Sequence, residues 1–177
     1  VTLSAALDPN SRYGEVTSGS ADVTKRLNVM PDLGDKSYTP TSGIDFQVLD
    51  LVWNTTGSKT EFGKGTINEG DHVYFAARVV NAGSENSATA VKLGVAFRQN
   101  GVAFSQGSNG FLWCDDGPSR EPLAAGEQKL FPVNSGAAGR DYWVADRNCA
   151  NFLIHVNDDG SRDETDKSNN TRTCPLA

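Results

Sequence analysis

Residues 72–81 alternate almost perfectly between two sets of side chains. One set is Val73, Phe75, Ala77 and Val79, and the other is His72, Tyr74, Ala76 and Arg78. A period of two is typical of a β-strand that buries one face. Residues 91–98 repeat this alternation, and no stretch of ten residues sustains a helical period. The chain is therefore predicted to be all-β.

From Ile44 onward, short strand-like runs alternate with clusters of Gly, Asn and Asp. The predicted strands are 46–53, 72–81, 91–98, 102–106, 127–133, 151–156 and 170–174. The turn Gln99-Asn100-Gly101 predicts that 91–98 and 102–106 form a hairpin. About seven short strands predict an immunoglobulin-like or fibronectin-like antiparallel β-sandwich. Trp53 is assigned to its core.

The first 44 residues differ in composition from the rest, because Ser, Thr, Gly and Asp dominate them and apolar runs are short. We interpret 1–44 as a linker or N-terminal appendage and 45–177 as the sandwich. The chain begins at Val1 rather than Met, which favours a piece of a longer parent polypeptide.

The charge balance argues against two kinds of partner. Sixteen Lys and Arg against 22 Asp and Glu give a net charge of −6, which disfavours nucleic acid because the phosphates would be repelled. A membrane span needs about 18 consecutive apolar residues, and the sequence contains no such run. We expect neither nucleic acid nor membrane as a partner.

Three cysteines occur without a CxxC motif, so structural zinc is not expected. If the strands beside Cys149 and Cys174 are antiparallel neighbours, these two cysteines should meet at one pole of the sandwich. We predict a disulfide between them, which suits an exported protein, and a free thiol at Cys114.

Aromatic side chains in the long predicted loops are the first candidate binding residues. Sugar rings present apolar faces that stack on aromatics, together with hydroxyls that bond to carboxylates and amides. The candidate ligand-binding residues are Trp113, Asp115, Asp116, Tyr142 and Trp143. The alternative interpretation is that these aromatics are plugs packed beneath their loops.

The acidic loop 157–168 is the second candidate. Calcium takes carboxylate, amide and carbonyl oxygens, and the candidate ligands are Asn157, Asp158, Asp159, Glu164 and Asn170. The alternative is a solvated turn. Alternating strand direction predicts that this loop shares a pole with 107–122, and that Tyr142 and Trp143 lie at the opposite pole.

Catalysis is not expected from this sequence. His72 and His155 both fall in predicted strands, and no GxSxG, HExxH, Walker or GxGxxG pattern occurs. We therefore predict that the chain is not an enzyme.

The order of motifs from Asp45 to Thr173 resembles the CARDB domain, the cell-adhesion-related domain in bacteria. The matching segments are Phe46–Trp53, Asn68–Asp71, Arg78–Gly83, Leu123–Glu127, Val156–Asp159, Asp163–Asp166 and Ser168–Thr171. Asn157 stands where this family usually has Asp, and Lys167 where it often has Glu. The resemblance implies a fibronectin-type sandwich that serves as an accessory module in secreted bacterial adhesive or polysaccharide-active proteins.

These observations predict a noncatalytic carbohydrate-binding module of a secreted bacterial polysaccharide-active enzyme. Its expected partners are a polysaccharide and a covalently linked catalytic domain, with calcium as a structural cofactor, outside the cell or at its surface. The alternative is a structural or adhesive module that spaces domains or binds a protein surface.

Overall fold

The computed structural model describes residues 36–87, 93–115 and 122–176, which all belong to one compact unit, 32–177. These residues form strands, turns and loops but no helix, and so no helix that could cross a membrane is found among them. The all-β prediction is confirmed.

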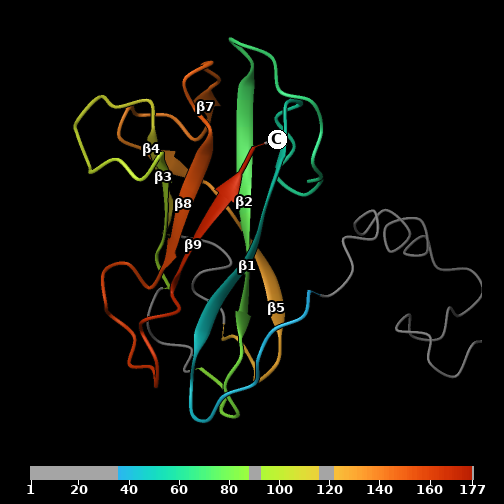
Figure 1. Ribbon diagram of the computed structural model, residues 1–177, viewed down its shortest axis with the longest axis vertical. Helices are drawn as coiled ribbons and strands as arrows, with labels where there is room; N and C mark the ends of the chain where they lie inside the picture. The colour runs from blue at the N-terminus through green and yellow to red at the C-terminus, as the bar shows by residue number, and fades with distance from the viewer. Residues whose placement is uncertain (1–35, 88–92, 116–121, 177) are drawn as a thin grey trace, which may run out of the picture. The chain divides into compact units, whose positions relative to one another are not determined.

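Two antiparallel sheets make up the sandwich (Figure 1). The four-stranded sheet contains β1 (Phe46–Asn54), β2 (His72–Asn81), β5 (Gln128–Pro132) and β7 (Trp143–Val144). The five-stranded sheet has the order β6 (Ser135–Gly136), β4 (Phe111–Cys114), β3 (Val95–Gln99), β8 (Asn151–Val156), β9 (Thr171–Pro175).

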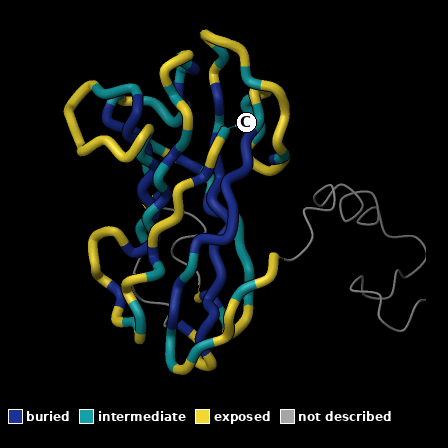
Figure 2. The backbone as a smooth tube through the Cα atoms, in the orientation of Figure 1, coloured by how far each residue is buried: buried dark blue, intermediate teal, exposed yellow. Residues whose placement is uncertain are grey.

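The main core lies between the sheets and takes alternate side chains from the longer strands, with a shift at the irregularity between Val48 and Asp50 of β1. On β8, for example, Phe152, Ile154 and Val156 are buried whereas Leu153 and His155 are only partly covered. Figure 2 shows the strands as predominantly buried and the connecting loops as exposed. Trp53 packs in this core, as predicted, and its Nε1 donates to the carbonyl of Gly65 at 2.8 Å.

The predicted hairpin is wrong in its second strand. Asn100 and Gly101 adopt positive φ and turn the chain where expected, but residues 102–106 form no strand. Instead β3 pairs with β4, from Val95↔Cys114 to Arg98↔Phe111. The side chains of Val102 and Phe104, which a strand would bury in part, are 41% and 57% exposed.

Residues 36–44, which the sequence assigned to the linker, pack along the four-stranded sheet. Tyr38 contacts a cluster of Leu49, Val80 and Ala82, and the Thr41 amide donates to the carbonyl of Ala82 at 2.9 Å. Residues 1–35 lie outside the described part of the chain.

The disulfide predicted between Cys149 and Cys174 does not form, and both residues are thiols. Strands β8 and β9 are antiparallel neighbours, but Cys174 lies opposite Phe152. Cys149 precedes Phe152 by three residues, or about 10 Å of extended chain, whereas bonded cysteines have Cα atoms within about 7 Å. Burial raises the pKa of both thiols to about 11.

Candidate functional site

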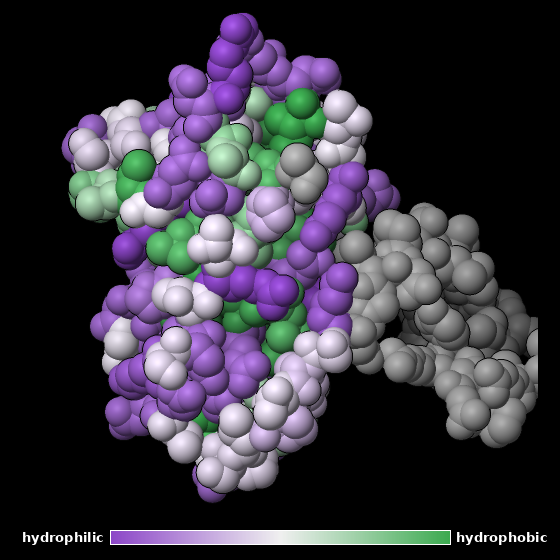
Figure 3. All heavy atoms as spheres, viewed as in Figure 1, coloured by the Kyte–Doolittle hydropathy of each residue, from purple (hydrophilic) through white to green (hydrophobic). Residues whose placement is uncertain are grey.

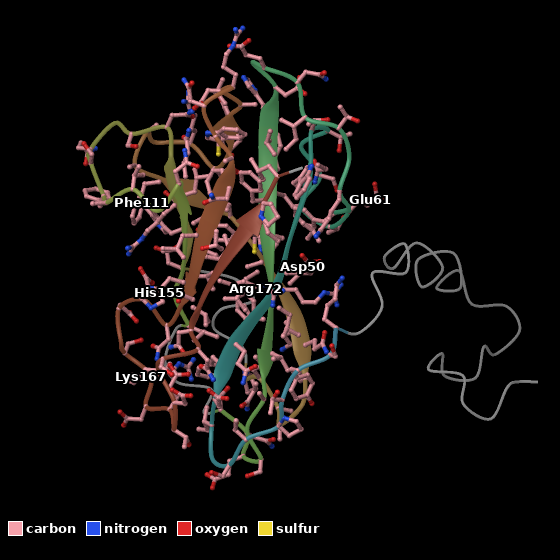
Figure 4. The ribbon with its side chains drawn as sticks, viewed as in Figure 1. Asp50, Glu61, Phe111, His155, Lys167 and Arg172 are labelled. Carbon is pink, nitrogen blue, oxygen red and sulfur yellow. The ribbon has the colours of Figure 1, made fainter. Side chains whose placement is uncertain are left out.

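A pocket of about 330 Å³ lies on the outer face of β3 and β4 and continues to the turn after β8. Its lining combines three aromatic side chains at one end with three carboxylates at the other. The lining residues are Gly94, Val95, Phe104, Phe111, Trp113, Cys114, Asp115, Asp158 and Asp159. Strands β4 and β8 are the two neighbours of β3 in the sheet. Figure 4 labels Phe111 on β4 and His155 on β8.

The aromatic end follows from the alternation of β4. Leu112 and Cys114 enter the main core, so Phe111 and Trp113 face outward, where they join Ala96 and Ala137 in a separate small cluster. The exposed ring of Phe104 packs edge-on against Phe111, with 5.4 Å between ring centroids. Figure 3 shows apolar side chains over the loop after β3, at the left of the upper half, among polar neighbours.

Ala96 on β3 packs with the aromatic end of the pocket. It lies between Trp113 on β4 and His155 on β8, because it pairs with both in the sheet. It belongs to the small cluster of Phe111, Ala137 and Trp113, and Trp113 is half-buried.

The acidic end is built around Gly94. Val95 pairs with Cys114 and with Val156, so Gly94 is flanked by Asp115 after β4 and by the turn after β8. That turn begins at Asn157, which has a φ of 54° and whose amide donates to the carbonyl of Gly94 at 2.7 Å. A Cβ atom on residue 94 would lie 2.9 Å from Oδ1 of Asp158.

The electrostatics of this end disfavour additional negative charge. Burial raises the pKa of Asp158, and neighbouring Asp159 raises it further, against the opposing effects of His155 and Arg98. Burial lowers the pKa of His155, so its ring is neutral at neutral pH. Asp159 in turn interacts with the guanidinium of buried Arg162 and opposes the lowering of the Arg162 pKa by burial.

The second predicted group of ligand residues does not provide a stacking surface. Trp143 is 1% exposed and belongs to the core, where its Nε1 donates to Oε1 of Gln99 at 3.1 Å. Tyr142 is half-buried; the ring of His72 stacks on it at 4.2 Å, and the guanidinium of Arg140 also lies over it. Trp143 is therefore packed beneath its loop, as the alternative interpretation predicts. The side chains of His72 and Arg140 already cover Tyr142.

A larger pocket of about 430 Å³ lies near Trp143 and Cys149, at the opposite pole. Of its three charged residues, Glu69 and Arg147 pair with each other, and Asp146 accepts hydrogen bonds from Gln99 and from the Asn148 amide. The nearby Trp143 presents no exposed face. This pocket therefore lacks free aromatic surface, and the pocket on β3 and β4 is the stronger candidate site.

The five predicted calcium ligands fall into two groups. The carboxylate of Glu164 faces β1 and accepts hydrogen bonds from the Phe46 amide and from the Nδ2 atoms of Asn157 and Asn170. Asp158 and Asp159 instead line the pocket beside Gly94. Among the described residues, no three His, Cys, Asp or Glu side chains group as metal ligands.

The interaction of Glu164 with Asn157, Asn170 and Phe46 is better described as a latch. It fastens the loop after β8 to the beginning of β1 by hydrogen bonds alone. Asn157 reinforces it, because its Oδ1 accepts from the Arg162 amide and its Nδ2 donates to the Arg162 carbonyl. We refer to Asn157, Glu164, Asn170 and the Phe46 amide as the Glu164 latch.

The predicted proximity of the two loops holds for the residues that can be placed. Trp113 and Asp115 share the pocket with Asp158 and Asp159, whereas Asp116 lies outside the described residues. The sequence did not indicate Phe104, Phe111 or Gly94 as site residues. The sequence predicts a strand at Phe104, but the polar residues that follow it, Ser105 to Asn109, indicate an exposed loop.

Together, the fold and this site define a β-sandwich with an aromatic and acidic pocket on one sheet face. Comparison with protein-family models, curated proteins and solved structures found no match.

Proposed function

We propose that this chain is a noncatalytic carbohydrate-binding module that acts as part of a secreted bacterial polysaccharide-active protein. The observation that carries the proposal is the pocket on β3 and β4, where a half-buried Trp113 and a 57% exposed Phe104 stand beside three carboxylates. An aromatic face suits the apolar side of a sugar ring, and carboxylates accept hydrogen bonds from its hydroxyls.

The size and rigidity of the pocket support the same function. Its volume lies at the lower end of the range of about 300–1,000 Å³ for small-molecule sites, which suits a short stretch of a glycan. Paired strands supply Phe111, Trp113 and Val95, so most of the surface is fixed before a ligand arrives.

The alternative is a structural or adhesive module. Two of the three tryptophans, Trp53 and Trp143, are buried, as such a module would require. Trp113 and Phe104 favour the binding module, because a spacer has no use for accessible aromatics beside a group of carboxylates.

Affinity electrophoresis and isothermal titration against plant, algal and microbial polysaccharides test the proposal. We expect at least one glycan to retard the protein and Phe104→Ala to weaken that interaction about fivefold, given roughly 1 kcal/mol for an aromatic contact. Val102→Ala is the matched control, because Val102 is also exposed in the same loop but does not line the pocket. Failure of every glycan to bind would refute the proposal in favour of the spacing module.

A further inference from the structure

The outer face of the four-stranded sheet carries a buried cation, Arg78. It is 7% exposed and pairs with Asp50 of β1 and Leu130 of β5 in the sheet. Its neighbours on the same face of β2, Ala76 and Val80, belong to two separate apolar clusters. Arg78 therefore lies between apolar groups and keeps its charge there, because a guanidinium does not deprotonate in proteins.

One edge of the Arg78 guanidinium has no hydrogen-bond acceptor. Its Nε and Nη2 atoms are buried and find no partner among the described residues. The N–H bonds of these two atoms point in parallel, in the fork that matches two oxygens of a carboxylate, sulfate or phosphate group. Buried donors without an acceptor destabilise a fold, so this edge calls for two acceptor oxygens from outside the described chain.

The carboxylate of Asp50, which lies opposite Arg78 in the register, is engaged by other groups. Its Oδ1 accepts from Nζ of Lys64 at 2.6 Å and from the Leu51 amide at 3.0 Å, and its Oδ2 lies 3.4 Å from Nζ of Lys36. Burial alone would raise the pKa of Asp50, but Lys64, the Leu51 amide and Lys36 together lower it. Three cations therefore share one ionised carboxylate, labelled in Figure 4, and positive charge is in excess here on a chain of net charge −6.

An oxyanion meets both needs of this group, whereas water meets one. Water molecules could accept from the buried N–H bonds, but they would leave the excess positive charge uncompensated. The side chains of Lys36 and Lys64 are each 47% exposed, so the positive group reaches the surface, where it attracts anions. Apolar surroundings strengthen the ionic hydrogen bonds once they form.

We propose that Arg78, with Lys36 and Lys64, forms an oxyanion-binding site on the outer face of the four-stranded sheet. Two oxygens of a carboxylate or sulfate group accept from Nε and Nη2 of Arg78, and the two ammonium groups add to the positive potential. The oxyanion is a free ion or an acidic substituent of a glycan. This site lies on the other sheet from the pocket on β3 and β4, and it does not depend on the proposed carbohydrate binding there.

The test titrates sodium acetate and sodium sulfate into the ¹⁵N-labelled protein, with sodium chloride added to keep the ionic strength constant. We expect a saturable shift of the Nε–Hε NMR signal of Arg78 and a rise in Tm with either anion. The Nε–Hε signal of Arg147, which donates to Glu69, should stay in place as an internal control. Absence of a saturable shift at Arg78 overturns the site.

Two sets of variants separate the site from general attraction. Arg78→Lys keeps the charge but removes the fork, and it should weaken acetate binding about tenfold. Lys36→Gln with Lys64→Gln leaves the buried residue in place and should weaken it about fivefold. Arg147→Gln with Lys167→Gln removes the same two charges from exposed positions elsewhere and should change it less than twofold. Equal losses in the two double variants overturn the site.

A titration with trigalacturonate, whose sugar rings carry carboxylates, identifies the source of the oxyanion. Tighter binding than that of acetate, lost in Arg78→Lys, assigns the oxyanion to a glycan, and equal binding of the two ligands assigns it to a free ion. Both results support the site at Arg78. Binding of trigalacturonate that is the same in the wild type and in Arg78→Lys, without a shift of the Arg78 signal, occurs elsewhere on the protein and overturns it.

Discussion

Trp113 lies on a regular strand, but its side chain is outside the main core. It packs beside Ala96 on the outer face of the sheet. Removing its ring should therefore cost little packing between the sheets, while it removes the largest aromatic surface of the pocket.

The first prediction is that Trp113→Ala weakens glycan binding about tenfold and changes the free energy of unfolding by less than about 1.5 kcal/mol. The first effect reflects a lost stacking contact and its buried area, and the second reflects a site outside the main core. Titration calorimetry and urea denaturation measure the two effects.

Trp143 provides the contrast, because it is 1% exposed. Trp143→Ala should reduce stability by about 3–5 kcal/mol, as expected when a large core side chain is removed. If Trp113→Ala were as destabilising as Trp143→Ala, Trp113 would be a core residue and the pocket would lose its main surface.

Glu164 illustrates a carboxylate whose role is structural. It accepts from the Phe46 amide at 2.9 Å and from Asn157 and Asn170, both at least 97% buried. The second prediction is that Glu164→Ala destabilises the protein by about 2–4 kcal/mol, because three buried donors lose their acceptor. Chemical denaturation measures the loss.

Two controls sharpen this prediction. Asp163→Ala removes the neighbouring carboxylate, which is exposed, and should leave stability within about 0.5 kcal/mol. Chelation with EDTA should leave the Tm of the wild-type protein unchanged, because hydrogen bonds hold the Glu164 latch. A fall in Tm on chelation that Glu164→Ala abolishes would instead reveal calcium at this loop.

Segment 41–45 is held to strand β2 by close backbone packing at Gly83. A Cβ atom on residue 83 would lie 2.0 Å from the carbonyl oxygen of Gly43 and 2.9 Å from the amide nitrogen of Asp45. Both neighbours are backbone atoms that already bond to their surroundings: the carbonyl of Gly43 accepts from the Glu85 amide, and the amide of Asp45 donates to Oδ1 of Asn81. Neither backbone atom can move away from residue 83 without weakening its hydrogen bond.

The third prediction is that Gly83→Ala destabilises the protein by about 3 kcal/mol, at the upper end of overpacking costs. It should also make residues 36–45 susceptible to proteolysis, since the added methyl group separates them from β2. Gly65→Ala is the matched control, because nothing lies within 4 Å of its Cβ position. Equal stability of the two variants would show that the segment is not held at Gly83.

Most of the strands were predictable from the sequence. Strands β1, β2, β5, β8 and β9 coincide with the predicted ranges within one residue at each end, and the alternation of β2 and β8 reflects burial of one face, which imposes a period of two. Strand β4 could not be predicted in this way. It has only four residues, Phe111–Cys114, too few to show a period, while Val102–Phe104 looked equally strand-like.

The candidate site was predictable to the extent that topology determines it. Strand direction alone indicated that Trp113 and Asp115 would meet Asp158 and Asp159. Burial of individual aromatics was not predictable, because a Trp in a core and a Trp on a sheet face have similar local sequences. Gly94, which lines the pocket, carries no chemical signal of its own, and only the register of β3 with β4 and β8 reveals its position.

The molecule as a whole is acidic, with a pI near 4.8, and Asp158 shows how the binding site contributes to pH dependence. Burial raises its pKa above the ordinary value of 3.8. At a pH between the pKa of Asp158 in the unfolded chain and its higher pKa in the folded protein, the folded protein retains a proton that the unfolded chain has lost. Folding stability therefore decreases as the pH rises through this window, and it stays lower above the folded-state pKa.

The fourth prediction follows from that sign: Asp158→Asn raises the Tm at neutral pH and leaves it unchanged below pH 3.8, the ordinary pKa of this side chain. Asp166→Asn is the control of opposite sign, because hydrogen bonds from Ser168 lower the pKa of Asp166, so that its ionised form stabilises the fold and its loss should not raise the Tm at neutral pH. Scanning calorimetry between acidic and neutral pH measures both variants. A higher Tm together with weaker glycan binding would mean that Asp158 is retained at the expense of stability, as expected for a ligand-binding carboxylate. A Tm that falls in Asp158→Asn at neutral pH would show that the effects of His155 and Arg98 outweigh burial and that the ionised group already stabilises the folded protein.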